Sequence, residues 1–111
     1  MPQIPTQVSF RNMDKPMGVE ERVLENVEAL GRFHANITGC RVMIERRNHR
    51  HRTGDFFQVR IDVTVPGAEL VVNHEPAQDR ADEALTVTVR AAFDEIRRRI
   101  EDHVRRARTD R

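Results

Sequence analysis

The chain has 111 residues, a length that fits a single domain of about 100–200 residues, with a core that needs no metal or disulfide support. Its 19 basic and 18 acidic side chains give a formal net charge of only +1, which excludes a uniformly basic or acidic tail protein. Of the 19 cations, 18 are arginine and only Lys15 is lysine, an excess that either phosphate recognition or a GC-rich genome explains.

The first part of the chain predicts an edge strand and an amphipathic helix. Residues 4–12 are expected to form the strand. Asp14 is a candidate N-cap with Pro16 in the first turn, and the helix is expected to run for about four turns to a breaker near Gly31. The apolar residues at helical spacing are Val19, Val23, Val27 and Leu30.

Three further strands are predicted after a loop at residues 36–39. Alternating apolar and polar residues place them at 40–45, 57–65 and 68–73. The stretch Arg46–Gly54 holds no apolar residue, so we expect a solvated loop there. Pro66 and Gly67 make the last turn, in which proline excludes type I′ and favours type II or a slightly longer loop. With two loop residues, Val63 faces Leu70 and Ile61 faces Val72.

A long second helix is predicted beyond Glu75 and Pro76. Its apolar residues at spacings of three and four are Leu85, Val89, Ala92, Phe93, Ile96, Ile100 and Val104. From about Arg105 the chain has too few apolar residues to pack and is expected to fray.

The order β-α-β-β-β-α predicts the architecture. A strand–helix–strand unit gives parallel neighbours with the helix on one face of the sheet, and the second helix buries its apolar stripe on that same face. We therefore expect an α+β fold, a two-layer sandwich in which a four-stranded sheet carries two helices on one face and has its other face open to water.

Dividing the charge by segment changes the meaning of the small total. The net charges are +4 for residues 41–60, +4 for 97–111, −3 for 14–31 and −5 for 61–83. Segregated positive segments of this kind are able to form an anion-binding surface in a nearly neutral protein.

The two positive segments differ in how strongly they suggest a partner. Four arginines and two histidines within seven residues of the Arg46–Gly54 loop repel one another without helping the fold, which favours an anionic partner over a merely solvated loop. In the second helix, acids precede arginines by four residues, a pairing that also fits an ordinary solvated face. The pairs are Asp94–Arg98, Glu95–Arg99, Glu101–Arg105 and Asp102–Arg106, which leave Arg97 and Arg108 without local acids.

No residue pattern suggests catalysis, a metal or a cofactor. His49 and His51 lack a full ligand set, Ser9 is the only serine, and no glycine-rich phosphate loop is present. Cys40, the only cysteine, is expected to be a small buried residue, and His74 to be structural. We expect a non-enzymatic chain in the reducing cytoplasm, since no secretory signal or membrane-spanning stretch is visible.

Two segments of the sequence, together with the order of its elements, resemble those of a known family. The element order, the segment Phe56–Asn73 and the closing run Ala92–Ile100 resemble the ribosome hibernation-promoting factor family, the RaiA-like ribosome-associated inhibitors formerly called sigma-modulation proteins. The likeness spans about 100 residues. The family's Asp-x-Tyr element is replaced here by Ala84-Leu85-Thr86, and we expect the protein to lack the dimerisation domain of long-form members.

The resemblance implies a single ribosome-binding domain over residues 1–111, with a fold akin to a double-stranded-RNA-binding domain. It implies a translation inhibitor bound to rRNA of the small ribosomal subunit, in the mRNA and tRNA channel, with no membrane or small-molecule partner. Pairing of ribosomes would need another factor. Arg98 falls on the family's recurrent basic position, and Arg105 and Arg106 in its basic tail. The full set of arginines expected to bind phosphates is Arg46, Arg47, Arg50, Arg52, Arg97, Arg98, Arg105 and Arg106.

Two other functions remain open at this stage. A general double-stranded-RNA-binding module would bind free duplex RNA as well as ribosomes. A protein–protein adaptor would use the open sheet face with Met43 and Phe56, and its binding would depend little on salt.

Overall fold

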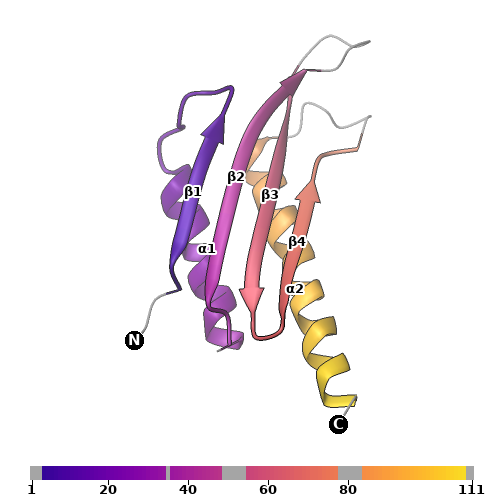
Figure 1. Cartoon of the computed structure of the whole chain (residues 1–111). Coiled ribbons are helices and arrows are strands. Elements are labelled where there is room, and N and C mark those ends of the chain that lie inside the picture. Colours follow the sequence, from indigo (N-terminus) through magenta and orange to yellow (C-terminus); the bar gives the residue numbers. More distant parts are fainter. Residues whose placement is uncertain (1–3, 35, 49–54, 78–83, 110–111) are drawn as a thin grey trace.

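The computed structural model describes residues 4–34, 36–48, 55–77 and 84–109 (Figure 1). The elements are β1 Thr6–Arg11, α1 Val19–Phe33, β2 Gly39–Asn48, β3 Asp55–Val65, β4 Ala68–His74 and α2 Leu85–Thr109. The predicted order of strands and helices is thereby confirmed. None of the helices in these ranges is both long enough and apolar enough to cross a bilayer.

The four strands form one sheet in the order β1-β2-β3-β4. β1 is parallel to β2, as expected for strands joined through a helix, and the other two pairs are antiparallel. Val63 pairs with Leu70 and Ile61 with Val72, which confirms the predicted register. Gly67 has a φ of +82°, the left-handed value that the third residue of a type II turn requires.

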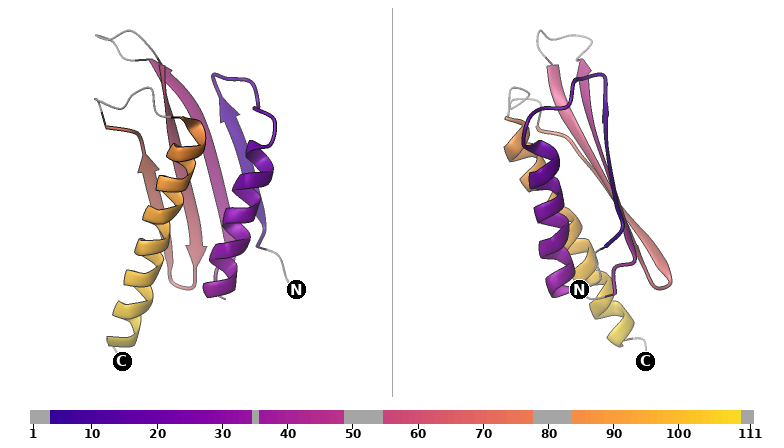
Figure 2. Two further views of the ribbon diagram at one scale, coloured as in Figure 1. Left: turned by 180° about the vertical axis from the view of Figure 1, so that it is seen from behind. Right: turned by 90° about the vertical axis from the view of Figure 1, so that its left-hand side faces the viewer.

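Both helices pack on one face of this sheet, so the molecule has two layers (Figure 2). α2 lies against β3 and β4, and α1 lies beside β1 and α2. The buried side chains between the layers include Val23, Val27, Leu30, Val42, Ile44, Ile61, Val63, Val89, Ile96 and Ile100. Burial of each such side chain contributes roughly 1.5–3 kcal/mol relative to exposure. The predicted α+β sandwich is confirmed.

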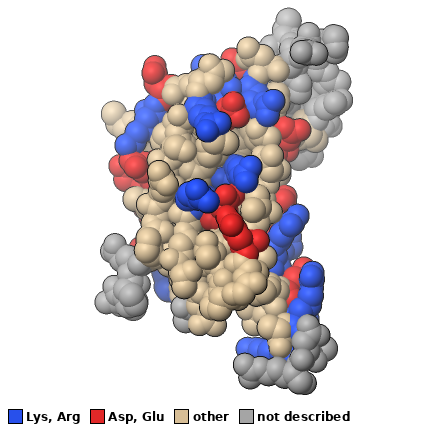
Figure 3. Space-filling model, viewed as in Figure 1, with Lys and Arg blue, Asp and Glu red and all other residues tan. Residues whose placement is uncertain are grey.

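The other face of the sheet, turned toward the viewer in Figure 3, carries charges of both signs. Strand alternation places Arg41, Arg60, Asp62 and Glu69 on it. An Asp62 carboxylate oxygen lies 3.1 Å from Arg60 Nε and another lies 3.8 Å from Arg41 Nη2, which is also 3.6 Å from Glu69 Oε1. The arginines at the centre of this face are therefore already paired with acids.

The second strand is longer than the sequence suggested. β2 continues to Asn48, with Arg46 opposite Phe57 and Arg47 opposite Phe56 of β3. The prediction that Arg46 and Arg47 begin a solvated loop is wrong, because β3 starts at Asp55 and offers hydrogen-bonding backbone to these residues. Residues 49–54, and with them Arg50 and Arg52, lie outside the described residues.

α1 also differs at both ends from the helix predicted from the sequence. It starts at Val19 after Gly18, whose left-handed φ of +82° interrupts helical geometry, so the prediction of Asp14 as N-cap is wrong. It also passes through Gly31 and ends at Phe33. An added Cβ at Gly31 would lie 2.9 Å from Ile4 Cδ1, so glycine here allows a close approach to the segment before β1.

The second helix starts at Leu85 and ends at Thr109. The prediction that the chain frays from about Arg105 is therefore wrong. Arginine and alanine, which dominate residues 105–108, are among the better helix formers, and the preceding Val104 is half-buried against the core. α2 thus holds its last arginines in helical positions.

Candidate nucleic-acid interface

The two arginines near the end of β2, Arg46 and Arg47, point in opposite directions. Because side chains alternate along a strand, Arg46 lies on the helix-covered side and Arg47 on the open face. The Arg46 guanidinium carbon lies 5.8 Å from the centroid of the Phe57 ring, and its Nε is 4.0 Å from Asp55 Oδ2. Arg47 Nη1 donates a hydrogen bond of 3.0 Å to Gln58 Oε1. These predicted phosphate ligands do not form one patch.

The arginines of α2 are exposed and mostly without acid partners. In the described part of the chain, Arg97, Arg98, Arg99 and Arg106 form no ion pair, and Arg105 Nη1 lies 3.5 Å from Asp102 Oδ1. Among the described residues the expected pairs Asp94–Arg98, Glu95–Arg99 and Asp102–Arg106 are not formed, and Asp102 contacts Arg105 at a spacing of three instead. Glu95, expected to pair with Arg99, instead lies 3.3 Å from His74 Nδ1 of β4.

Helical geometry divides these arginines between the sides of α2. At 100° per residue, Arg97 lies only about 20° from the direction of Arg90, whereas Arg98 and Arg105 point away from the core. Arg90 borders α1, so Arg97 is on that border too. Arg99 and Arg106 lie on the opposite flank, toward β4, with Glu95. The helix therefore presents cations both to solvent and to α1.

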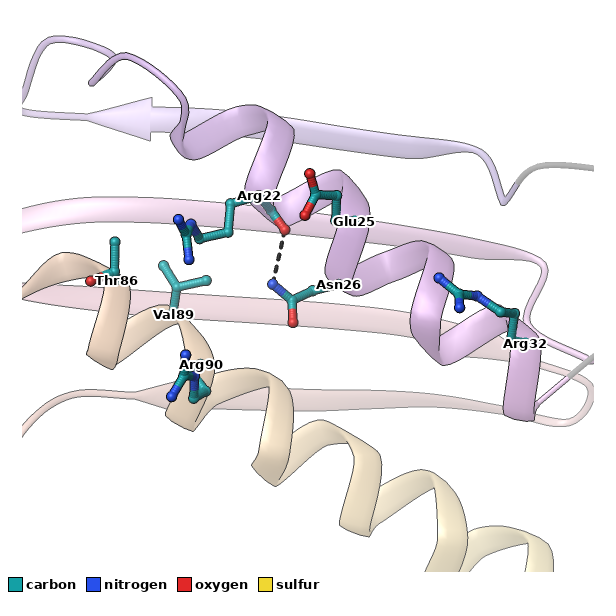
Figure 4. Close-up of a pocket in the computed structure, with 7 residues that line it drawn as sticks. All are labelled: Arg22, Glu25, Asn26, Arg32, Thr86, Val89 and Arg90. Atoms are coloured by element: carbon teal, nitrogen blue, oxygen red, sulfur yellow. Dashed lines mark hydrogen bonds between the residues drawn. The ribbon is translucent and has the colours of Figure 1, made fainter.

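A polar cleft of about 320 Å³ lies between α1 and the first turns of α2 (Figure 4). Three arginines line it, Arg22 and Arg32 from α1 and Arg90 from α2, together with the single acid Glu25. All three arginines are exposed, and none has an ion pair with another described residue. We refer to this cleft as the interhelical groove. Its residual positive charge makes it a candidate anion site.

Sequence reasoning missed the groove. Arg22 and Arg32 lie in or beside a segment whose net charge is negative, and Arg90 lies outside both positive segments. Their placement along one groove depends on how α1 packs beside α2, which no local pattern encodes. The one available signal was the spacing of seven between Arg90 and Arg97, which places both on one helix face.

The lone thiol of the chain is removed from any such surface. Cys40 lies on the inner side of β2, opposite Val63, and only 4% of it is exposed. Burial, together with the nearby negative charge of Asp62, raises the pKa of this thiol to about 12. The reactive thiolate is therefore scarce near neutral pH, in agreement with a structural role. In the described ranges no three His, Cys, Asp or Glu side chains gather as a metal site would require.

We expect Cys40 to resist alkylation by iodoacetamide at pH 8 in the folded protein and to react readily after unfolding in urea. The reason is that both the raised pKa and the burial withhold the thiolate. Mass spectrometry of time points with and without urea checks this. Equal rates in the two conditions would contradict the buried placement of Cys40.

Comparison with known proteins connects this fold with a family. The sequence model of the family described as "Sigma 54 modulation protein / S30EA ribosomal protein" matches residues 6–108. The chain belongs to this family. The resemblance drawn from the segment Phe56–Asn73 and the closing run of α2 is thereby confirmed. A search of curated protein sequences gives no significant match.

Two solved structures have the same fold as this chain. A ribosomal subunit interface protein from Coxiella burnetii superposes with a TM-score of 0.70 at 11% identity, covering 90% of this chain and 97% of that one. The N-terminal domain of Thermus thermophilus Protein Y gives a TM-score of 0.63 at 16% identity, covering 92% and 99%. Both likenesses establish the fold.

Proposed function

We propose that this family member binds the small ribosomal subunit through its helical side and inhibits translation by occupying the mRNA and tRNA channel. It would act in the cytoplasm, without catalysis. The observation that carries the proposal is the interhelical groove, which Arg22, Arg32 and Arg90 line without ion pairs among the described residues. The name of the Coxiella neighbour, a ribosomal subunit interface protein, supports a ribosomal partner.

Phosphate is the anion that these side chains suit best. Arg22 and Arg90 face the groove from two different helices and Arg32 lies further along α1 (Figure 4), so successive phosphates of one strand could accept forked hydrogen bonds along the groove. On α2, Arg97 lies on the side that borders α1, as Arg90 does. Arg98, Arg105 and Arg106 add cations on the outer surface of the helix. We keep these four as phosphate ligands and add the three arginines of the groove.

The hairpin arginines form a second, separate contact in this proposal. Arg46 and Arg47 lie at the end of β2, whereas Arg105 and Arg106 lie near the other end of the molecule (Figure 1). An RNA surface as large as a ribosomal subunit is able to reach both ends at once. Arg50 and Arg52 lie outside the described residues and stay in the proposal on their sequence alone.

Co-sedimentation with purified small ribosomal subunits at increasing potassium chloride tests this function. We expect affinity to fall by at least about 100-fold between roughly 50 and 200 mM salt, because each neutralised phosphate releases counterions. Affinity that does not change over this range would overturn the electrostatic proposal. Free duplex RNA added as a competitor tests the alternative of a general double-stranded-RNA-binding module. Duplex RNA at equal nucleotide concentration would displace such a module from the subunits.

The structure does not support the alternative of a protein–protein adaptor. It needed an apolar open sheet face, but Phe56 on that face is only 8% exposed and the arginines at its centre are paired with acids. A protein partner would also show little of the salt dependence expected above.

A further inference from the structure

An apolar cleft of about 510 Å³ lies where α1 ends, next to the β3–β4 turn and the last turns of α2. These three segments meet at one end of the molecule (Figure 2). Ile37, Val65 and Ile100 are among its buried lining residues. Its volume falls in the range of about 300–1,000 Å³ typical of ligand clefts.

An exposed aromatic ring stands at this cleft. Phe33, the last residue of α1, lines it and is 78% exposed, whereas Phe93 in the core is 5% exposed. Such exposure of a phenyl ring beside an apolar cleft is unfavourable in water, and a flat apolar partner would cover it. The neighbouring residue Arg32 lines the interhelical groove, so the cleft adjoins the proposed phosphate surface.

The polar groups of the cleft suit an electron-rich partner. Arg108 and two histidines line it, and none of its described lining residues is acidic. The Nε2 atom of His34 is buried and has no hydrogen-bond partner among the described residues. A buried ring nitrogen without a partner is uncommon, and an entering group with donors and acceptors would satisfy it.

We propose that this cleft receives one unpaired nucleobase of the bound RNA, with the base stacked on Phe33 and its edge hydrogen-bonded to His34. The proposal rests on the proposed function and extends it, because the adjoining arginines would hold the phosphates of the same strand. A nucleotide has a flat apolar base that would cover the Phe33 ring and a polar base edge that would hydrogen-bond to His34. Its phosphate carries the negative charge that the adjoining arginines would bind. Single-stranded RNA is commonly bound in this way, by stacking of unpaired bases on aromatic side chains.

Substitution of Phe33 separates stacking from simple apolar contact. We expect Phe33→Leu and Phe33→Ala each to weaken binding to purified small ribosomal subunits by about tenfold, and Phe33→Trp to retain wild-type affinity. Because Phe33 is exposed, all three variants should keep the wild-type melting temperature. The salt dependence of binding should also stay the same, since no phosphate contact is lost. Leu24→Ala, on the same helix but away from the cleft, is the control.

The tryptophan variant gives a second and direct measurement. The chain holds no tryptophan or tyrosine, so the Phe33→Trp variant has one indole fluorophore. Stacking with a base is expected to quench its emission when a short single-stranded oligoribonucleotide, which has no indole of its own, is added and binds. Unchanged emission on binding, or wild-type affinity of Phe33→Leu, would overturn the nucleobase proposal.

The outcomes distinguish the two proposals. If wild-type binding is salt-dependent but Phe33→Leu binds equally well, the cleft is not a base site and the proposed function stands. An apolar protein segment in the cleft would give that same result. If the wild-type protein does not bind small subunits, both proposals fail together.

Discussion

Replacing both Arg22 and Arg90 with glutamine is expected to weaken binding to small ribosomal subunits about 100-fold. The two guanidinium groups face the interhelical groove from different helices, and neither has an ion pair among the described residues. A charge-assisted hydrogen bond contributes about 1.5–3 kcal/mol, so each lost arginine lowers affinity by at least about tenfold. The salt dependence, measured as the slope of log affinity against log salt, should fall by about 1.5.

A variant with the same change of charge on the other side of the molecule provides the control. Arg11 and Arg41 are exposed on the open face of the sheet, and Arg41 already contacts Asp62 and Glu69. Arg11→Gln combined with Arg41→Gln should leave both affinity and salt slope close to wild type. Equal losses in the two double variants would mean that binding responds only to net charge, and the groove would not be the RNA site.

The fold was predictable because its patterns are local. Alternation from Val59 to Val65 and the turn at Pro66 and Gly67 specified a hairpin and its register, and the apolar stripe ending at Val104 specified α2. The errors lie at element ends, where patterns stop. Arg46 and Arg47 look like loop residues, yet the backbone hydrogen bonds available from β3 keep them in a strand.

The candidate site was predictable only in part, because it depends on packing between helices. The exposed position of Arg98 on α2 follows from helical spacing alone, whereas Arg105 and Arg106 were expected in a frayed tail and lie instead in the last turns of the helix. The groove needs in addition the position of α1, which brings Arg22 across to Arg90. Both helices bury apolar stripes on the same side of the sheet, and the polar flanks of those stripes then face each other.

The position of α2 therefore depends on its buried residues, and Ile96 is central among them. Its side chain is fully buried between α2 and the sheet. Ile96→Ala is expected to lower the free energy of unfolding by about 3–4 kcal/mol, through lost apolar transfer and the cavity left behind. For a domain of this size that corresponds to a fall in melting temperature of about 10–20 °C, measurable by circular dichroism or calorimetry.

Leu24→Ala is the matched control, because Leu24 is an apolar residue of α1 that is 44% exposed. We expect this variant to lose less than about 1 kcal/mol. A loss as large as that of Ile96→Ala would show that Leu24 is buried in solution, for example against a second copy of the chain. Well below its melting temperature the Ile96→Ala protein should still bind small subunits. The folded fraction remains high there, since a total stability of about 5–15 kcal/mol exceeds the loss, and the groove arginines are unchanged.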